Sequence, residues 1–285
     1  MSGVTLPISV VICTVDRPEA LQRCIRGLLG GDQPPAQVVV VDQGASTAPS
    51  ARDAKIDYLR ASDEGVSRAR NLGAAAASHD VLAFTDDDCL PSPRWLHAVT
   101  RAYDDGVDGV TGPVLPLPGA DGVAVSSRTS VIRRTFRGHG FAPWDIGTGG
   151  NLSLRRTVFD RVGGFDETLG PGTTGRAAED IDLLYRVVTA DCALIYEPDA
   201  VVYHELKTRR TRLNGRFDYG FGLGTFLGRH AAAGDEHARA LRRRYARQLG
   251  RRAASAARHG DGWPVVEAGL TLAGIIAGSV AAGRR

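Results

Sequence analysis

Cysteine, methionine and aromatic residues are scarce in this chain of 285 residues. The four cysteines are scattered without a CxxC pair, which argues against a disulfide framework and against a zinc knuckle. They are Cys13, Cys24, Cys89 and Cys192. Aromatic residues make up 6% of the chain, and no basic surface interleaved with them indicates nucleic-acid binding. We therefore expect no nucleic-acid partner.

The start of the chain shows no secretory signal. Residues 1–20 contain no basic stretch followed by an apolar run, so no secretory signal is visible and a cytoplasmic location is expected. The composition, 43% hydrophobic and 24% charged residues, excludes wholesale disorder and a bundle of several membrane spans. At about 150 residues per domain, the length suggests one large domain or two small ones.

Hydrophobic runs and helical periodicity alternate along the first two thirds of the chain. Runs rich in β-branched residues predict strands, and apolar residues three or four apart predict helices between them. Asp16 and Glu19 match a capping box before the first helix, which Gly30 and Gly31 end. The predicted strands are 8–13, 37–41, 56–60, 81–85, 108–114, 193–196 and 201–204, and helices are expected over 18–29, 66–78 and 94–103. This βαβα order predicts an α/β fold with a mostly parallel sheet flanked by helices.

Polar side chains follow several predicted strands. They are Thr14 and Asp16 after the first strand, Asp42 after the second, and Asp86, Asp87 and Asp88 after the fourth. Ligands of open α/β sheets bind beyond the carboxyl ends of the strands. Three adjacent carboxylates repel one another unless a cation or solvent compensates, and Mg²⁺ and Mn²⁺ prefer oxygen ligands. The triplet directly after a buried strand therefore favours a divalent metal site over a solvated acidic turn.

Several longer motifs occur in one order. ISVVICTVDRPEAL, VVVVDQGAS, GVSRARNLG and FTDDDCLPSPRWL resemble the nucleotide-binding half of family 2 glycosyltransferases, which have the GT-A fold. GTGGNLSLRRTVFDRVGGFDE and AEDIDLLYRV resemble the acceptor half of that family. The resemblance runs from Ile8 to His204. It predicts a nucleotide-sugar-binding half over 1–112, an acceptor-binding half over 113–204 and an Arg-rich helical extension with an apolar tail over 205–285.

The resemblance also implies roles for individual residues. Asp88 and His204 would hold a divalent metal, Mn²⁺ or Mg²⁺, and Asp180 would be the catalytic base. The donor site would comprise Thr14, Asp16, Asp42, Gln43, Arg70, Asp86 and Asp87. The acceptor site would comprise Gly150, Asn151, Glu179 and Trp144. Taken alone, Asp180 fits a first-turn acid of a helix better than a catalytic base, and His204 is more often a structural histidine than a ligand.

Two positions depart from the family pattern. Gln43 stands where the family frequently has a second aspartate that contacts uracil, and TVD replaces the common TYN, which removes an aromatic side chain. Because glutamine both donates and accepts hydrogen bonds, it can still contact the edge of a base. The identity of the nucleotide is left open by these departures.

The resemblance implies a non-processive, inverting glycosyltransferase. Its donor would be a nucleotide-diphosphate sugar, and its acceptor a hydroxyl of a glycan, a lipid-linked sugar or a natural product. The QxxRW motif of processive synthases is missing, and VICTVDRPEA lacks the glycine-rich loop of a nucleotidyltransferase. The alternative is a catalytically silent nucleotide- or nucleic-acid-binding protein of the same fold.

Charge and hydropathy change in the last third of the chain. Residues 1–204 contain 19 basic and 26 acidic side chains, whereas residues 205–260 contain 14 and 4. The uncharged run 268–283 has 16 residues, short of the roughly 20 that span a bilayer, so a packed or interfacial helix is expected. The arginines of 239–252 either form a solvated face or contact anionic lipid, which would place the protein peripherally at the inner face of the plasma membrane.

Overall fold

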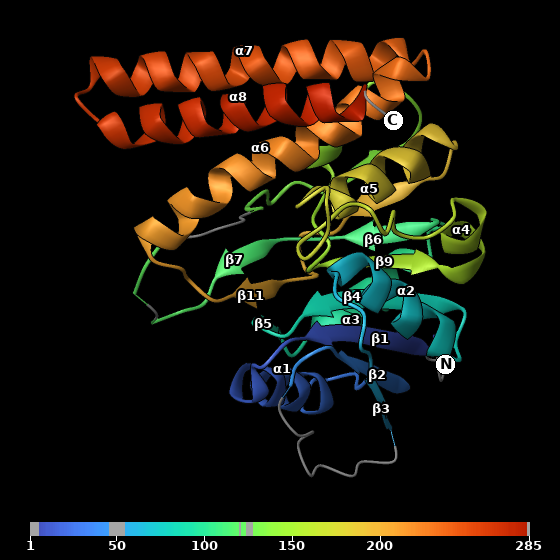
Figure 1. Ribbon diagram of the computed structural model, residues 1–285. Helices are drawn as coiled ribbons and strands as arrows, with labels where there is room; N and C mark the ends of the chain where they lie inside the picture. The colour runs from blue at the N-terminus through green and yellow to red at the C-terminus, as the bar shows by residue number, and fades with distance from the viewer. Residues whose placement is uncertain (1–5, 46–54, 120, 124–127, 284–285) are drawn as a thin grey trace.

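The computed structural model describes residues 6–45, 55–119, 121–123 and 128–283, which form an α/β fold around an eight-stranded sheet (Figure 1). The strand order is β3-β2-β1-β4-β9-β6-β10-β8. Their bounds are β1 Ile8–Thr14, β2 Gln37–Asp42, β3 Ile56–Arg60, β4 Val81–Asp86, β6 Gly109–Thr111, β8 Arg134–Phe136, β9 Leu152–Arg155 and β10 Leu194–Tyr196. The first four strands are parallel, whereas β9 and β8 run antiparallel to their neighbours. The predicted fold class is confirmed.

A small second sheet lies beside the first. It consists of β5 (Cys89–Pro91), β11 (Val202–His204) and β7 (Val114–Pro116), in that order. In its register His204 pairs with Cys89, the residue that follows the aspartate triplet. This pairing brings the end of β11 to the carboxyl end of β4, although more than a hundred residues separate them in the chain.

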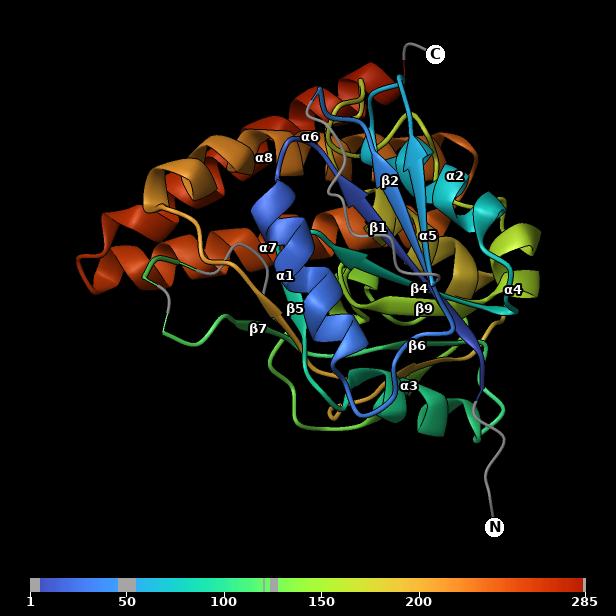
Figure 2. The same ribbon diagram turned by 90° about the horizontal axis from the view of Figure 1, so that it is seen from below.

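Helices cover both faces of the large sheet. Alternate residues of each central strand point to opposite faces, so Val10 packs in one core and Val11 in the other. Helices α1 (Pro18–Leu29) and α3 (Trp95–Tyr103) contribute to the first core, and α1 crosses in front of the strands in Figure 2. Helices α2 (Val66–Ala76), α4 (Arg156–Arg161) and α5 (Glu179–Thr189) contribute to the second core.

Two local predictions were wrong. The first helix has no capping box: Arg17 is its N-cap residue and makes no side-chain cap, while Asp16 has a left-handed backbone with φ of 51°. The predicted strand 108–114 is divided between the two sheets at Gly112 and Pro113. At Gly112 a side chain would overlap the carbonyl of Ala200, so the chain turns there against that backbone.

Three long helices form a layer at the end of the molecule opposite α1 and β3 (Figure 1). They are α6 (Arg209–Ala232), α7 (Glu236–Arg258) and α8 (Gly262–Ala282). Glycines allow α6 and α8 to approach closely, because a side chain at Gly274 or Gly278 of α8 would overlap the backbone of α6. A third core joins this layer to α5 and to the short 3-10 helix η1 (Pro143–Asp145).

Helix α8 is longer than the uncharged run in the sequence. It has 21 residues, and by length and composition alone it is a candidate for a membrane span. Glu267 near its start is paired with Arg212 of α6 at 2.6 Å. The glycine-bearing face of α8 packs on α6, as expected for a packed helix, while Ile276 and Val280 are exposed.

Candidate active site

The carboxyl ends of β1, β2 and β4 meet at one edge of the sheet. Thr14 pairs in register with Asp42, and Cys13 pairs with Asp86. A cavity of about 450 Å³ opens beyond this edge. Its lining includes Thr14, Arg17, Gln43, Glu64, Arg70, Asp86, Asp87, Asp88, Glu179 and His204. Five of the seven predicted donor residues, Thr14, Gln43, Arg70, Asp86 and Asp87, therefore share one cavity with the predicted metal residues Asp88 and His204.

Each aspartate of the triplet contacts at least one cation, and Arg17 is shared by Asp87 and Asp88. Asp86 accepts a hydrogen bond from Arg70 at 2.8 Å. Asp87 accepts one from the Thr14 hydroxyl at 2.7 Å and another from Arg17 at 2.9 Å. The like charges of three adjacent carboxylates are thus offset by side chains from different elements.

Asp88 contacts more cationic side chains than Asp86 or Asp87 does. Its Oδ2 accepts from Arg17 at 3.0 Å and from Lys207 Nζ at 2.7 Å, and its Oδ1 lies 3.4 Å from His204 Nε2. Burial alone raises the pKa of Asp88, but the nearby positive groups, His204 first and then Lys207, outweigh it and lower that pKa. Burial also raises the pKa of Asp87, and there the Thr14 hydrogen bond offsets only part of the effect.

Asp88 and His204 fit a divalent cation. Ligand atoms of Asp88, Cys89 and His204 all lie within 4.8 Å of one another. Burial raises the pKa of Cys89 well above its usual value, and a cysteine sulfur is a soft ligand that Mn²⁺ and Mg²⁺ do not prefer. A carboxylate oxygen and an imidazole nitrogen remain, a donor set that Mn²⁺ and Mg²⁺ accept when phosphate oxygens complete the shell.

Arg70 connects the triplet to the start of α5. Its guanidinium is buried and donates at 2.8 Å both to Asp86 and to Glu179. Burial, and next the charge of Asp180, raise the pKa of Glu179 to about 7. Arg70 still lines the cavity, but both of its terminal nitrogens bind protein carboxylates, so its first role in this arrangement is to hold Asp86 and Glu179 together.

Asp180 lies one residue beyond the cavity lining, in the first turn of α5. Its Oδ2 accepts from the Gly149 N–H at 2.8 Å, and its Oδ1 accepts from the Ile181 N–H at 2.7 Å. The preceding loop is strained, because Arg176 and Ala178 have left-handed φ values of 67° and 71°. Asp180 is thus both a first-turn acid of α5 and the acceptor of the Gly149 N–H.

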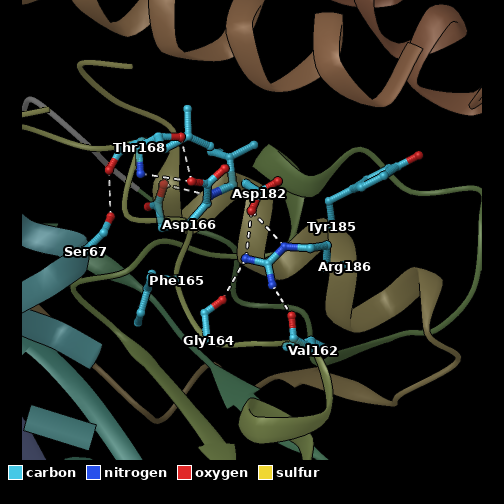
Figure 3. A network of polar contacts seen from close by, with 12 residues as sticks. Ser67, Val162, Gly164, Phe165, Asp166, Thr168, Asp182, Tyr185 and Arg186 are labelled. Atoms are coloured by element: carbon cyan, nitrogen blue, oxygen red, sulfur yellow. Dashed lines mark hydrogen bonds and ion pairs between the residues drawn. The ribbon is translucent and has the colours of Figure 1, made fainter. Parts of the chain in front are cut away.

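A polar network holds α5 in place (Figure 3). Arg186 donates to the carbonyls of Val162 and Gly164 and is paired with Asp182 at 2.7 Å. Asp182 is also 3.1 Å from His230 of α6. Because both neighbouring segments are bound to α5, the start of this helix has a defined position beside the cavity.

The loop after β2 lies beside the cavity, at the positions predicted to contact the base. Asp42 is buried and does not line the cavity; it accepts from the Gly44 N–H, from Tyr58 and from Arg60. Gln43 does line the cavity, and its Nε2 donates to the carbonyls of Asp63 and Gly65. Asp16 is exposed, outside the lining, with its carboxylate close to Gly44.

The predicted acceptor residues occupy different environments. A Cβ at Gly150 would lie 2.7 Å from Asp86 Oδ2, so this backbone passes directly beside the triplet. Asn151 is buried, accepts from Trp95 Nε1 and donates to the carbonyls of Pro113 and Ala200. Trp144 is buried against Tyr245 of α7, with ring centroids 4.8 Å apart. Asn151 and Trp144 therefore make contacts inside the protein and do not line the cavity.

Sequence reasoning missed Arg17 and Lys207. Arg17 sits next to Asp16 beyond the end of β1, and Lys207 follows His204 by three residues. Their positions after strands were a usable signal, because cations at the carboxyl edge of a sheet face the same cavity as the acids. The pairing of Lys207 with Asp88 depends on the second sheet, which the sequence did not indicate.

The architecture and the acid cluster define a protein of the GT-A class: strands β3-β2-β1-β4 carry an aspartate triplet at their carboxyl edge, opposite an acid pair at the start of α5. The family model described as glycosyl transferase family 2 matches residues 9–163, more than half of the chain. The chain belongs to this family.

Two curated relatives illustrate the likeness. The pre-mycofactocin glycosyltransferase of Mycobacterium tuberculosis is 28% identical over 214 residues, which cover 71% of this chain and 43% of that protein. The glucosyl-dolichyl phosphate glucuronosyltransferase of Haloferax volcanii is 27% identical over 238 residues, covering 73% of this chain and 72% of that protein. The chain thus spans less than half the length of the first relative.

Solved structures share the fold. A mannosyltransferase from Pyrobaculum calidifontis, in complex with GDP-Man and Mn²⁺, has a TM-score of 0.60 at 18% identity and covers 94% of this chain and 86% of its own. GalNAc-T7 with UDP, GalNAc and Mn²⁺ has a TM-score of 0.57 at 17% identity, covering 71% and 44%. At these identities the likeness establishes the GT-A fold.

Proposed function

We propose that this chain transfers a sugar from a nucleotide-diphosphate sugar to an acceptor hydroxyl, by a single displacement that inverts the anomeric carbon. The observation that carries the proposal is the shared cavity, where Asp88 and His204 face Glu179 and Asp180 follows directly. The GDP-Man, UDP and Mn²⁺ named with structures of the same fold support a metal-dependent nucleotide-sugar donor.

The triplet region would receive the donor diphosphate. Asp88 and His204 would hold Mn²⁺ or Mg²⁺, which when bound neutralises the charge of the leaving diphosphate. Arg17 and Lys207 already lie at Asp88 and supply further positive charge for phosphate oxygens. Asp86, held by Arg70, would accept hydrogen bonds from the sugar or ribose hydroxyls.

Asp180 would act as the base. Its two N–H donors, from Gly149 and Ile181, fix the orientation of the carboxylate. The acceptor hydroxyl would lose its proton to this carboxylate as it attacks the anomeric carbon. One carboxylate is sufficient beside the metal residues, because a single displacement needs no protein nucleophile, unlike retaining hydrolysis.

Gln43 presents a hydrogen-bond acceptor to the base. Its amide nitrogen is directed at the carbonyls of Asp63 and Gly65, so the amide oxygen is the group left for a ligand. An oxygen in this position accepts a hydrogen bond from a ring N–H of uracil, thymine or guanine, and also from the exocyclic amino group of cytosine, so Gln43 alone does not select the base. The UDP and GDP-Man named with structures of the same fold favour a uracil or guanine base, and thymine shares the ring N–H of uracil. We therefore propose UDP, dTDP or GDP as the nucleotide.

The donor experiment is thermal stabilisation by UDP, GDP, dTDP and CDP, each with and without Mn²⁺. We expect stabilisation by the first three that requires Mn²⁺ and is lost in Asp88→Asn. Stabilisation by CDP alone would contradict this choice of nucleotide.

The catalytic experiment is metal-dependent hydrolysis or transfer from the sugar nucleotide that binds. Asp180→Asn should lower kcat by about 10²- to 10⁴-fold while nucleotide binding persists. Asp160→Asn, at an exposed position of α4, is the matched control. An Asp180→Asn variant with wild-type turnover, or a wild-type protein that binds nucleotide without turnover, would overturn the proposal, the latter in favour of a silent binding protein.

The acceptor is proposed to be a glycan, a lipid-linked sugar or a similar hydroxyl compound, reached by peripheral contact with the inner face of a membrane. Val265, Val266, Ile276 and Val280 are exposed on the side of α8 that faces away from α6, beside the arginine-rich α7. Apolar and basic surfaces together suit an anionic bilayer surface. Flotation with phosphatidylglycerol vesicles should weaken in Ile276→Asp. It should persist in Val131→Asp, the control at an exposed apolar residue outside α8. Equal flotation of the two variants would refute the membrane contact.

A further inference from the structure

A second concave region lies between α7 and η1, outside the donor cavity. This groove of about 380 Å³ is lined by Asp145, Arg244, Arg247, Gln248, Arg251 and Arg252. The five α7 residues occupy positions i, i+3, i+4, i+7 and i+8 of the helix, so they share one face. Four guanidinium groups and one carboxylate thus line a single depression instead of being spread around the helix.

The arginines of this groove are poorly neutralised. Asp145 lies 3.3 Å from Arg244. Arg247 donates to the carbonyl of Arg243 on its own helix. Within residues 6–45, 55–119, 121–123 and 128–283, no carboxylate pairs with Arg247, Arg251 or Arg252. All four arginines are exposed, so solvent and counter-ions meet their charge in the free protein, and a ligand with several negative charges can displace those counter-ions.

The groove shares a chain segment with the candidate base. Asp145 precedes Gly149 by four residues, and the Gly149 N–H binds Asp180. A stretch of four residues spans at most about 14 Å, so the groove lies within the reach of one or two sugar units from Asp180. Trp144, packed on Tyr245, joins the same segment to α7.

We propose that this groove binds a phosphate group of the acceptor while the reacting hydroxyl lies at Asp180. The inference rests on the proposed glycosyl transfer and adds a substrate class to it: acceptors that carry a phosphate or diphosphate ester. A guanidinium offers two parallel N–H donors to two phosphate oxygens, and arginines in adjacent turns present several such pairs. Sugar phosphates and prenyl-linked phosphates share this chemistry.

The experiment measures binding to three proteins by calorimetry: wild type, Arg247→Gln/Arg251→Gln, and Arg243→Gln/Arg258→Gln as the control. Both double variants remove the same charge from the same helix, but Arg243 and Arg258 lie outside the groove. Inorganic pyrophosphate without metal is the first probe. We expect the groove variant to bind about tenfold more weakly and the control within about twofold of wild type. Equal weakening in both variants, or none in the groove variant, would overturn the inference.

The source of the phosphate is distinguished with glucose 1-phosphate, farnesyl phosphate and phosphatidylglycerol vesicles. Groove-dependent binding of either ester supports the inference and identifies a soluble or a prenyl-linked acceptor. Groove-dependent binding of vesicles without binding of either ester overturns it and assigns the arginines to the membrane surface.

Nucleotide stabilisation in the presence of Mn²⁺, measured on the same three proteins, separates this inference from the proposed function. We expect it to be unchanged in both variants, because the groove and the donor cavity have no lining residue in common. Failure of all nucleotides to stabilise any of the proteins would contradict the transferase proposal. Retained nucleotide binding with unchanged pyrophosphate affinity in the groove variant would contradict the groove alone.

Discussion

The carboxyl edge of the sheet and the C-terminal helical layer are built in opposite ways. At the sheet edge, Asp86 and Glu179 share the cation of Arg70, and Asp87 and Asp88 share that of Arg17. In the helical layer, α6 and α8 are held by close backbone approach at glycines, and α7 keeps arginines without acids. The first region therefore depends on charge pairing, and the second on shape.

The largest effect is expected where charge pairing is broken. Arg70→Met keeps much of the side-chain volume but leaves Asp86 and Glu179 without their shared cation. Removing one partner of a buried ion pair costs about 3–5 kcal/mol, so the free energy of unfolding in urea should fall by that amount. Arg68→Met is the control on the same helix: Arg68 is half-exposed, 3.4 Å from Glu167, and its loss should cost at most about 1 kcal/mol. An equal loss of unfolding free energy in the two variants would contradict a larger stabilising role for the buried Arg70 than for the exposed Arg68.

The second effect tests the role of shape in the helical layer. At Gly278 of α8 a methyl group would overlap the carbonyl of Phe221, so Gly278→Ala should destabilise the protein by about 1–3 kcal/mol. Gly269 of the same helix has open space around it, and Gly269→Ala should stabilise by about 0.5–1 kcal/mol through helix propensity. Thermal unfolding of the two variants measures these opposite changes in stability. A change of the same sign in both variants would refute close packing of α6 on α8.

The third effect is a pH dependence at the sheet edge. Burial and the charge of Asp180 raise the pKa of Glu179 from an ordinary 4.5 to about 7. A raised folded-state pKa adds stability below the unfolded value, and this contribution is lost as pH rises through about 7. Glu179→Gln should flatten the fall in unfolding free energy between about pH 4.5 and about pH 8, measured by urea titration. If unfolding free energy fell with pH as steeply in Glu179→Gln as in wild type, Glu179 would be excluded as the source of the pH dependence.

The smallest effect concerns the unpaired arginines. Arg247 and Arg251 are like charges four residues apart on α7, a spacing that destabilises a helix by about 0.2–0.5 kcal/mol. Arg247→Gln/Arg251→Gln should therefore gain about that much stability at low ionic strength, and the gain should vanish in high salt. A loss of stability at every salt concentration would mean that these guanidinium groups have protein partners.

The two regions also differ in how far the sequence predicts them. Strands β1 to β4 and the positions of Thr14 and Asp88 follow from contiguous hydrophobic runs that end in polar residues. The Arg70–Glu179 pair joins residues 109 positions apart, and no local pattern reveals it. The division of 108–114 between two sheets depends on the nearby Ala200 carbonyl, which hydrophobic periodicity does not encode.

The C-terminal layer was predicted only in outline. The composition of 205–285 indicates basic and apolar helices, but the pairing of α6 with α8 is a property of two glycine faces that meet in space. The arginines of α7 look like a solvated face in the sequence, and their groove exists because η1 lies opposite them. Tertiary contact, rather than helix propensity, decides which of these side chains share a surface.

Gly222 of α6 limits how this protein can be redesigned. A side chain there would overlap the carbonyl of Ala177, next to the left-handed Ala178 that precedes Glu179 and Asp180. Libraries aimed at new acceptors should therefore keep α6 constant along this contact, because a displaced Ala178 would shift the start of α5, and should diversify exposed positions of α7 such as Arg247 and Arg251.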